Sequence, residues 1–211
     1  MGKPTELAEE QRRALDRLKA VRGIERFYLA GRTALALHLH HRRSLDLDLF
    51  SLSPDVDLSA MIEPLRRELP DLKVLSLTEA ALRVVGAGIP IDFVLYPYAL
   101  LDPPETGSAA LPIAGLRDLA AMKLSAISQR GLRRDFWDVH AMVESGLTLR
   151  EMADAYLARF GVAKADLYHV LRSLTYFDDA ERAPEYPSGL TPKKWERIKE
   201  FFRAEAPKLV D

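Results

Sequence analysis

Two aspartates in an alternating segment, Asp46 and Asp48, are the residues whose types and spacing most directly suggest chemistry. Residues 44–50 read Ser-Leu-Asp-Leu-Asp-Leu-Phe, and this alternation of apolar and acidic residues predicts a β-strand. Successive side chains of a strand point to opposite faces, so the leucines, from Leu45 onward, are expected to enter the core and both acids to share the other face. Two such carboxylates, about 6.5–7 Å apart at their Cα atoms, can hold Mg²⁺.

A lone Asp-x-Asp is most often a solvated surface pattern, but three further features favour a site. Gly31 stands between a predicted strand and a predicted helix, a layout in which helix amides face a phosphate. Asp92 is the one acid in the apolar segment 90–96, and a basic helical segment runs from Lys123 to Asp138. Nucleotidyl transfer needs carboxylate-held metal ions and cationic side chains around a triphosphate, so these residue types together indicate phosphate chemistry.

The elements that must position these residues change character along the chain. Helices are predicted over 5–22, with Thr5 as N-cap, and over 33–39 and 57–69, and strands over 27–30, 44–50, 73–77, 82–85 and 90–96. After a proline-rich loop over 97–112, helices are predicted over 116–129, 134–145, 149–160 and 164–175, then a loop over 178–192 and a helix over 192–207. The sequence therefore predicts an α/β domain over 1–112 and an α-helical region over 113–211.

The composition narrows the class of protein. Of the 211 residues, 48% are hydrophobic and 29% charged, which is typical of a soluble globular chain, and no apolar run is long enough to cross a bilayer. There is no cysteine, so disulfides, zinc–thiolate sites and thiol catalysis are excluded. We expect a cytoplasmic protein with no membrane partner. The net charge is −1, but residues 117–134 are basic, which suits a single anionic ligand better than a long duplex.

Three segments carry a resemblance to a known family. Residues 27–50, from Phe-Tyr-Leu-Ala-Gly-Arg-Thr-Ala-Leu to Ser-Leu-Asp-Leu-Asp-Leu-Phe, closely resemble the first motif of the AbiEii/AbiGii-type nucleotidyltransferase toxins. These belong to the DNA polymerase β-like nucleotidyltransferase superfamily. Residues 90–97 and 118–139 resemble the family's later motifs, in the same order. The resemblance implies a small mixed β-sheet nucleotidyltransferase core with flanking helices, followed by an α-helical region that completes the active-site cleft.

The resemblance also implies an activity and roles for residues. It implies transfer of a nucleoside monophosphate from an NTP, with Mg²⁺ or Mn²⁺, to a hydroxyl of RNA, a tRNA end or a protein. Many such proteins are toxins of bacterial toxin–antitoxin or phage-defence systems, which implies an antitoxin partner. The matched catalytic positions are Asp46, Asp48, Asp92, Lys123, Asp135 and Asp138, and the first three of them match the metal ligands. The candidate nucleotide-binding residues are Gly31, Arg32, Thr33, Arg42, Ser44, Lys123, Arg130 and Arg134.

One position departs from the family pattern. The family usually has Gly-Gly or Gly-Ser where this chain has Gly31-Arg32. The Arg32 side chain could donate to the triphosphate or could block it. Two alternatives therefore stand beside the transferase: a catalytically impaired NTP-binding or interaction protein of the same fold, and a protein phosphotransferase.

Structural alternatives stand beside the site residues as well. Asp92 could cap a hairpin or pair with an arginine, and Lys123 could be a surface lysine. Asp138 could form an ordinary i,i+4 ion pair with Arg134. The histidines at 38, 40 and 41 resemble a metal cluster, but without a thiolate we do not expect zinc.

Overall fold

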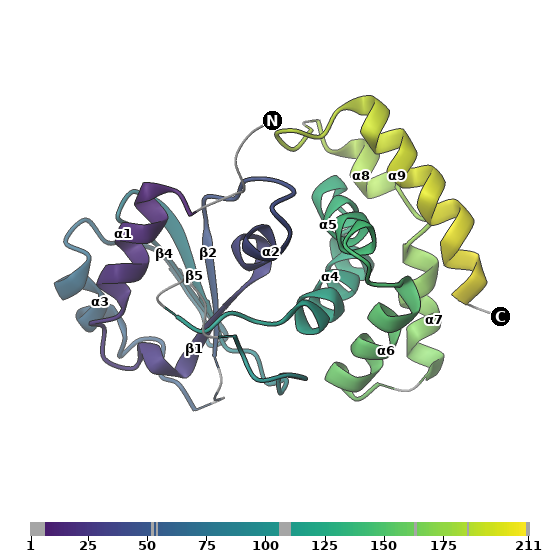
Figure 1. The fold of residues 1–211 in the computed structure, drawn as a ribbon. Helices are drawn as coiled ribbons and strands as arrows, with labels where there is room; N and C mark the ends of the chain where they lie inside the picture. The colour runs from purple at the N-terminus through teal and green to yellow at the C-terminus, as the bar shows by residue number, and fades with distance from the viewer. Residues whose placement is uncertain are drawn as a thin grey trace. The chain divides into compact units, whose positions relative to one another are not determined.

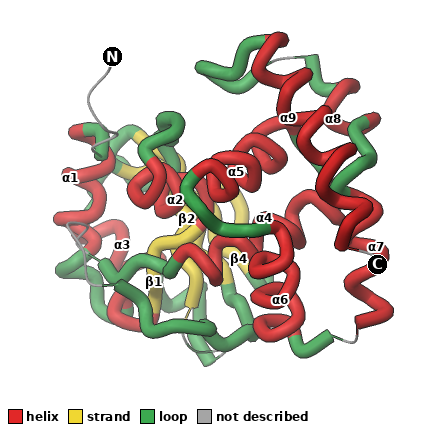
Figure 2. Tube along the Cα trace, turned by 45° about the vertical axis from the view of Figure 1, so that its right-hand side comes forward, coloured by secondary structure: helices red, strands yellow, loops and turns green. Residues whose placement is uncertain are grey.

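A computed structural model describes residues 7–51, 53, 55–105, 111–162, 164–184 and 186–209. The chain divides into two compact units, Met1–Gly115 and Leu116–Asp211 (Figure 1). Strands are confined to the first unit in the part of the chain that the structure describes, and the second unit consists of helices and loops (Figure 2). None of the described helices is long and apolar enough to cross a membrane.

The first unit is built on a five-stranded sheet in the order β1-β2-β5-β4-β3. Its strands are β1 (Phe27–Ala30), β2 (Leu47–Ser51), β3 (Lys73–Leu77), β4 (Ala81–Gly86) and β5 (Ile89–Val94). The β2 and β5 strands are parallel, and the other neighbours are antiparallel. The prediction of a small mixed sheet is therefore confirmed.

Among the described residues of the first unit, three α-helices flank this sheet. Figure 1 shows α1 (Glu9–Leu18) and α3 (Ile62–Glu68) on one side and α2 (Gly31–Leu39) on the other. A short 3₁₀ turn, η1 (Ile24–Arg26), leads into β1. The helices predicted over 5–22 and 57–69 are shorter in the structure, and the predicted N-cap Thr5 lies outside the described residues.

Alternation along β2 and β5 separates an apolar face from an acidic face. Leu47 and Leu49 are fully buried, and so are Ile91 and Phe93 beside them. The prediction that Leu45 also enters the core is wrong, because its side chain is 59% exposed. The pairing of β1 with β2 ends at Ala30 opposite Asp48, so residues before 47 have no ladder partner on that side to hold them in the strand.

The predicted break between the last two strands is a two-residue hairpin. Ala87 and Gly88 both have positive φ, at 53° and 82°, as the turn that fits twisted antiparallel strands requires. The carboxylate of Asp71 accepts hydrogen bonds from both of their backbone N–H groups, at 3.0 and 3.1 Å. This hairpin fixes the register that places Arg83 of β4 opposite Asp92 of β5.

The second unit packs its helices around α4. Its elements are α4 (Leu116–Arg130), α5 (Arg133–Glu144), α6 (Leu149–Phe160), α7 (Lys164–Ser173), α8 (Asp178–Arg182), α9 (Pro192–Glu205) and η2 (Ala206–Leu209). The α4 helix contacts α5, α6 and α7, and α9 packs against α5. The loop predicted over 178–192 contains the five-residue α8, which is too short to produce a periodic pattern.

An aromatic cluster forms the core between α5, α8 and α9. The ring of Phe136 lies 5.1 Å from Phe177, 5.8 Å from Trp195 and 5.4 Å from Phe202, measured between centroids. Trp137 is 1% exposed and Trp195 is fully buried. Both tryptophans are therefore core residues of the second unit.

Candidate functional site

The register of the sheet places two of the predicted acids side by side. Asp48 of β2 and Asp92 of β5 are direct partners in the parallel ladder. Both are half-buried, whereas their neighbours on the opposite face are fully buried. Asp46 lies just before β2 and is 8% exposed.

Buried polar contacts hold the backbone at Asp46. Its carbonyl oxygen accepts hydrogen bonds from Thr33 Oγ1 at 2.5 Å and from Gln11 Nε2 at 3.3 Å. Gln11 Nε2 also donates to Thr33 Oγ1 at 3.1 Å, and both side chains are buried. The hydroxyl of Thr33, a predicted nucleotide-binding residue, therefore joins the start of α2 to the segment before β2. Gln11 is a supporting residue that sequence reasoning missed, because nothing in α1 marks one glutamine as buried.

Arg32 contacts both aspartates of the Asp-x-Asp pair. Its guanidinium forms an ion pair with Asp46 Oδ2, and its backbone N–H donates to Asp48 Oδ2 at 3.3 Å. The hydroxyl of Ser44 donates to the other oxygen of the Asp46 carboxylate. Arg32 and Ser44, both predicted as nucleotide-binding residues, therefore engage the two oxygens of one predicted metal ligand.

Gly31 permits the close approach of α2 to β2. Its φ is +62°, a left-handed conformation that side chains disfavour. A Cβ atom at this position would lie 2.7 Å from Cγ of Asp48. Glycine therefore allows the helix to begin against the aspartate, where the backbone N–H of Arg32 donates to Asp48.

Asp92 has an environment suited to accepting a proton. Burial raises the pKa of Asp92 above its usual value, the Arg83 guanidinium lowers it, and the Asp48 carboxylate raises it, with a net upward direction. Arg83 Nε lies 3.5 Å from Asp92 Oδ2, and the Arg83 side chain is 63% exposed. A raised pKa brings a carboxylate closer to the range in which a general base works best. Sequence analysis did not identify Arg83 as a partner of Asp92. The turn at 87–88, which sets the register between β4 and β5, was the signal that could have shown it.

The donor set of the first unit suits a hard cation. Asp46, Asp48 and Asp92 offer carboxylate oxygens, the ligands that Mg²⁺ and Mn²⁺ prefer. The guanidinium of Arg32 against Asp46 shows that a positive group is accepted there. No three His, Cys, Asp or Glu side chains among the described residues are gathered in a metal-binding arrangement. The residue types therefore fit the ion, and their carboxylates must turn from the contacts seen here to bind it.

Arg42, another predicted nucleotide-binding residue, lies in the turn before β2. Its side chain is half-buried, and Nη1 donates to the backbone carbonyl of Arg43 at 3.3 Å. His38 lies on α2, and its Nε2 is 2.9 Å from the carbonyl oxygen of Ala114, within the same unit. His40 ends the helix in a left-handed conformation, so the three histidines do not share one helical face.

The second unit brings together four other predicted residues. Lys123 Nζ of α4 lies 2.7 Å from Asp138 Oδ2 and 3.3 Å from Asp135 Oδ1 of α5. Arg130 holds Asp135 with two hydrogen bonds, from Nε at 3.0 Å and from Nη2 at 3.1 Å. Both aspartate side chains are fully buried, Lys123 is 6% exposed, and Arg130 is 49% exposed. These side chains form a row of alternating charges. The row begins at the buried Asp138, continues through Lys123 and Asp135, and ends at the half-exposed Arg130.

The electrostatics of this chain favour the charged form of its central acid. Burial alone raises the pKa of Asp135, but Lys123 and Arg130 lower it more strongly, and the net direction is downward. The Asp135 carboxylate is fully buried and bound by two cations, so it fixes their orientation and is not accessible to solvent. The alternative of a surface lysine at 123 is wrong, since the side chain is almost completely buried. Arg134 is half-buried on α5.

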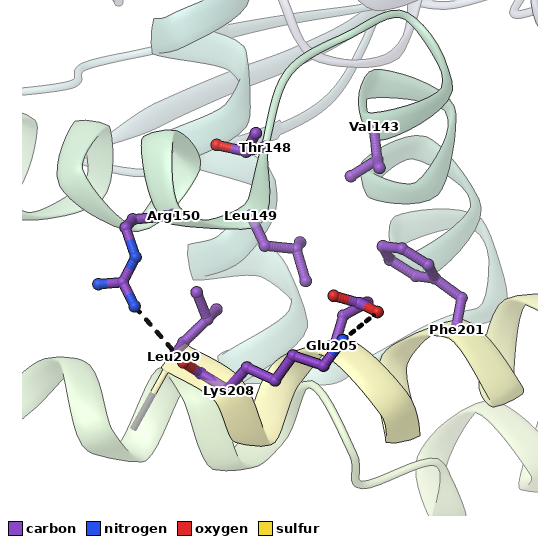
Figure 3. A pocket seen from close by; sticks show the side chains of 8 residues that line it. All are labelled: Val143, Thr148, Leu149, Arg150, Phe201, Glu205, Lys208 and Leu209. Carbon is purple, nitrogen blue, oxygen red and sulfur yellow. Dashed lines mark hydrogen bonds and ion pairs between the residues drawn. The ribbon is translucent and has the colours of Figure 1, made fainter. Parts of the chain in front are cut away.

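A separate buried ion pair joins Arg159 of α6 to Asp118 of α4, and both side chains are fully buried. Sequence reasoning placed Asp118 in a motif but did not predict this partner, which lies forty-one residues further along the chain (159 − 118). A cavity of about 310 Å³ also lies in this unit, lined by Leu149, Phe201 and Leu209, with the Lys208–Glu205 ion pair at 2.7 Å (Figure 3). None of the predicted site residues lines this cavity.

A match to a protein-family model identifies the family of this chain. The profile of the nucleotidyl transferase AbiEii toxin of type IV toxin–antitoxin systems matches residues 13–210. The chain belongs to this AbiEii family. The match covers both units, so the sheet with its three acids and the helical region with its Lys123 cluster are parts of one family architecture.

One curated protein and two solved structures are also similar to this chain. The chain is 32% identical over 211 residues to the uncharacterized protein aq_aa25 of Aquifex aeolicus (strain VF5), covering 97% of this chain and 98% of that protein. A structure from H. pylori described as a nucleotidyltransferase has a TM-score of 0.52 at 14% identity, covering 96% of this chain and 94% of that chain. MenT4, the nucleotidyltransferase toxin Rv2826c of Mycobacterium tuberculosis H37Rv, has a TM-score of 0.52 at 15% identity, covering 96% and 86%. At these identities the two structures show a shared fold.

Proposed function

We propose that this AbiEii-family protein transfers a nucleoside monophosphate from an NTP to a hydroxyl acceptor. The acceptor oxygen attacks the α-phosphorus, the bond from that phosphorus to the bridging oxygen of the β-phosphate breaks, and pyrophosphate leaves. The observation that carries the proposal is the pairing of Asp48 with Asp92 on one half-open face, with Asp46 two residues away. Carboxylates are the metal ligands that phosphoryl transfer requires, and those of Asp46 and Asp48 would turn from their contacts with Arg32 to hold the ion.

The residues of the first unit have separate roles in the proposed reaction. Asp46 and Asp48 would hold Mg²⁺ or Mn²⁺, which supplies charge neutralisation at the phosphates when it is bound. Asp92 takes the proton from the attacking hydroxyl, and its raised pKa supports this role. The N-terminus of α2 at Gly31 presents backbone N–H groups to the triphosphate. Lys123, Arg130 and Arg134 stay predicted phosphate-binding residues of the second unit, and Asp135 orients the first two of them.

An aromatic group on the same face of the sheet favours an RNA end as the acceptor. Phe50 lies two residues beyond Asp48 on β2, and its ring stacks on Tyr28 at 6.0 Å and meets Tyr96 at 5.1 Å. Tyr96 in turn lies 4.9 Å from Tyr98, which is 40% exposed. Tyr28 is only 1% exposed, so it is Tyr98 that offers an exposed ring on which an unpaired base can stack. We further propose that an antitoxin protein controls the activity, as the type IV family description implies.

Label transfer tests the proposal. The purified protein is incubated with each α-labelled NTP, Mg²⁺ and total RNA, beside an Asp48→Asn variant. We expect label on RNA with the wild type and a loss of at least about 100-fold with the variant, since electrostatic groups at a reacting phosphate contribute on this scale. Asp55→Asn, an exposed carboxylate of the same unit, is the matched control and should transfer normally.

The same assay separates the alternatives. Label that appears only from γ-labelled NTP would identify a phosphotransferase. Label on protein in a reaction without RNA would identify a protein acceptor. Equal transfer by the wild type and Asp48→Asn, or no transfer by either, would refute the proposed activity. An impaired binding protein would bind NTP without any transfer.

A further inference from the structure

Arg32 contacts both acids of the Asp-x-Asp pair at the same time. Its guanidinium pairs with Asp46 and its backbone N–H donates to Asp48. The geometry follows from Gly31, which lets α2 begin in contact with β2, so that the next residue lies beside both carboxylates. The contact is therefore built into the start of the helix.

Protein groups engage both oxygens of the Asp46 carboxylate. Arg32 engages Oδ2 and Ser44 engages Oδ1, and the Asp46 side chain is only 10% exposed. A divalent cation that binds this carboxylate must displace at least one of these partners. Because charge-assisted hydrogen bonds are stronger than neutral ones, displacing Arg32 with no other anion to receive its guanidinium lowers the affinity for the ion.

A nucleoside triphosphate offers the guanidinium another anionic partner. The Arg32 side chain is 35% exposed, so it can move toward solvent without disturbing the core. Its backbone stands in the first turn of α2, where helix N–H groups attract phosphate. The guanidinium of an arginine can bind the oxygens of a phosphate with two parallel hydrogen bonds, as it binds those of a carboxylate.

We propose that Arg32 couples metal binding to nucleotide binding. Without nucleotide it occupies Asp46 and weakens the binding of a divalent cation there. When a triphosphate is present, the guanidinium moves to the phosphates and Asp46 is released. The ligands named here rest on the proposed function, but the coupling is a property of binding and needs no turnover. This arrangement keeps the metal site closed until the substrate that requires it has arrived.

The test measures two affinities that must change in opposite directions. Mn²⁺ binding is followed by electron paramagnetic resonance without nucleotide. Binding of the four non-hydrolysable α,β-methylene nucleoside triphosphates is followed by calorimetry at saturating Mn²⁺, where Arg32 has already left Asp46. For Arg32→Ala, we expect Mn²⁺ to bind about tenfold more tightly and the analogue that binds the wild type to bind about tenfold more weakly, as loss of one charge-assisted contact implies. Arg32→Gln, which keeps the length of the side chain, should shift both affinities in the same directions.

The matched control is Arg66→Gln, which removes an arginine from an exposed ion pair with Glu63 at 2.7 Å on α3. It should leave both affinities unchanged. Equal Mn²⁺ affinity in the wild type and both Arg32 variants would overturn the inference, and so would a failure of all of them to bind Mn²⁺. Tighter binding of both ligands in the variants would show that Arg32 only blocks the site, which also overturns it.

These results are independent of the label-transfer assay. Opposite shifts in a protein that transfers no label would support the coupling and refute the transferase. Label transfer by a protein whose Arg32 variants bind Mn²⁺ like the wild type would do the reverse.

Discussion

Replacing Lys123 by methionine is expected to destabilise the second unit by about 3–5 kcal/mol, the usual cost of removing one partner from a buried ion pair. Lys123 Nζ lies 2.7 Å from Asp138 and 3.3 Å from Asp135, and both aspartate side chains are fully buried. Methionine fills a similar volume and removes the charge. The carboxylates then stay in a region of low dielectric without the cation that balances them.

The cost is expected to fall mainly on Asp138. Asp135 keeps its two hydrogen bonds from Arg130, at 3.0 and 3.1 Å, whereas Lys123 makes the shortest contact to Asp138. A second substitution that removes the Asp138 charge should therefore recover much of the loss. We expect Lys123→Met with Asp138→Leu to be more stable than Lys123→Met alone by about 2 kcal/mol, because an apolar replacement of a buried pair is often nearly neutral.

Urea unfolding followed by tryptophan fluorescence measures these changes. The chain has two tryptophans, Trp137 and Trp195, and both are buried in the second unit, so the signal reports on that unit. Lys208→Met is the matched control, since Lys208 pairs with Glu205 at 2.7 Å but is 65% exposed. Its effect should stay within about 0.5 kcal/mol. A Lys123→Met protein as stable as this control would refute the reasoning.

Three further changes test other parts of the molecule. Gly31→Ala should abolish both label transfer and Mn²⁺ binding, because its φ is +62° and a Cβ atom would lie 2.7 Å from Cγ of Asp48; a variant that still transfers label would contradict the close packing. The rate of label transfer should rise as the pH passes the raised pKa of Asp92, and Arg83→Gln should move this rise to higher pH, since Arg83 lowers that pKa; a pH–rate profile shows the shift. The pKa of Glu181 is lowered to about 2 chiefly by its hydrogen bond from Lys199, so its contribution to stability is complete above 4.5 and is lost as the pH falls toward 2; Glu181→Gln should reduce the acid dependence in urea titrations.

Regular patterns in the sequence predicted most of the elements. The α6 helix runs over 149–160 as predicted, because Thr148 caps its start and Gly161, with a φ of +61°, ends it. The strand predicted over 73–77 is also observed without change. These signals are local, so a single stretch of sequence contains everything that decides the element.

Features that depend on contacts between residues far apart in the sequence could not be predicted from the sequence alone. Alternation at Leu45 continues the strand pattern, but β1 ends at Ala30 and gives the residues before 47 nothing to pair with on that side. The buried Asp118–Arg159 pair depends on α4 packing against α6, and the contact of Gln11 with Thr33 depends on α1 reaching the start of α2. Each involves residues with several possible partners, and only the fold selects one.

Position 32 shows how the same limit affects function. The sequence marks it as a departure, an arginine where a small residue is usual, and leaves open whether the side chain helps or blocks. The structure adds that this residue contacts Asp46 and Asp48 together, which requires the antiparallel pairing of β1 with β2 and the glycine before it. The contact with Asp48 comes from the backbone N–H, which any residue at this position would supply, whereas the contact with Asp46 comes from the guanidinium. An arginine is distinctive here because its guanidinium can exchange a carboxylate for a phosphate. In the coupling proposed above, helping and blocking are two states of one side chain, and nucleotide binding selects between them.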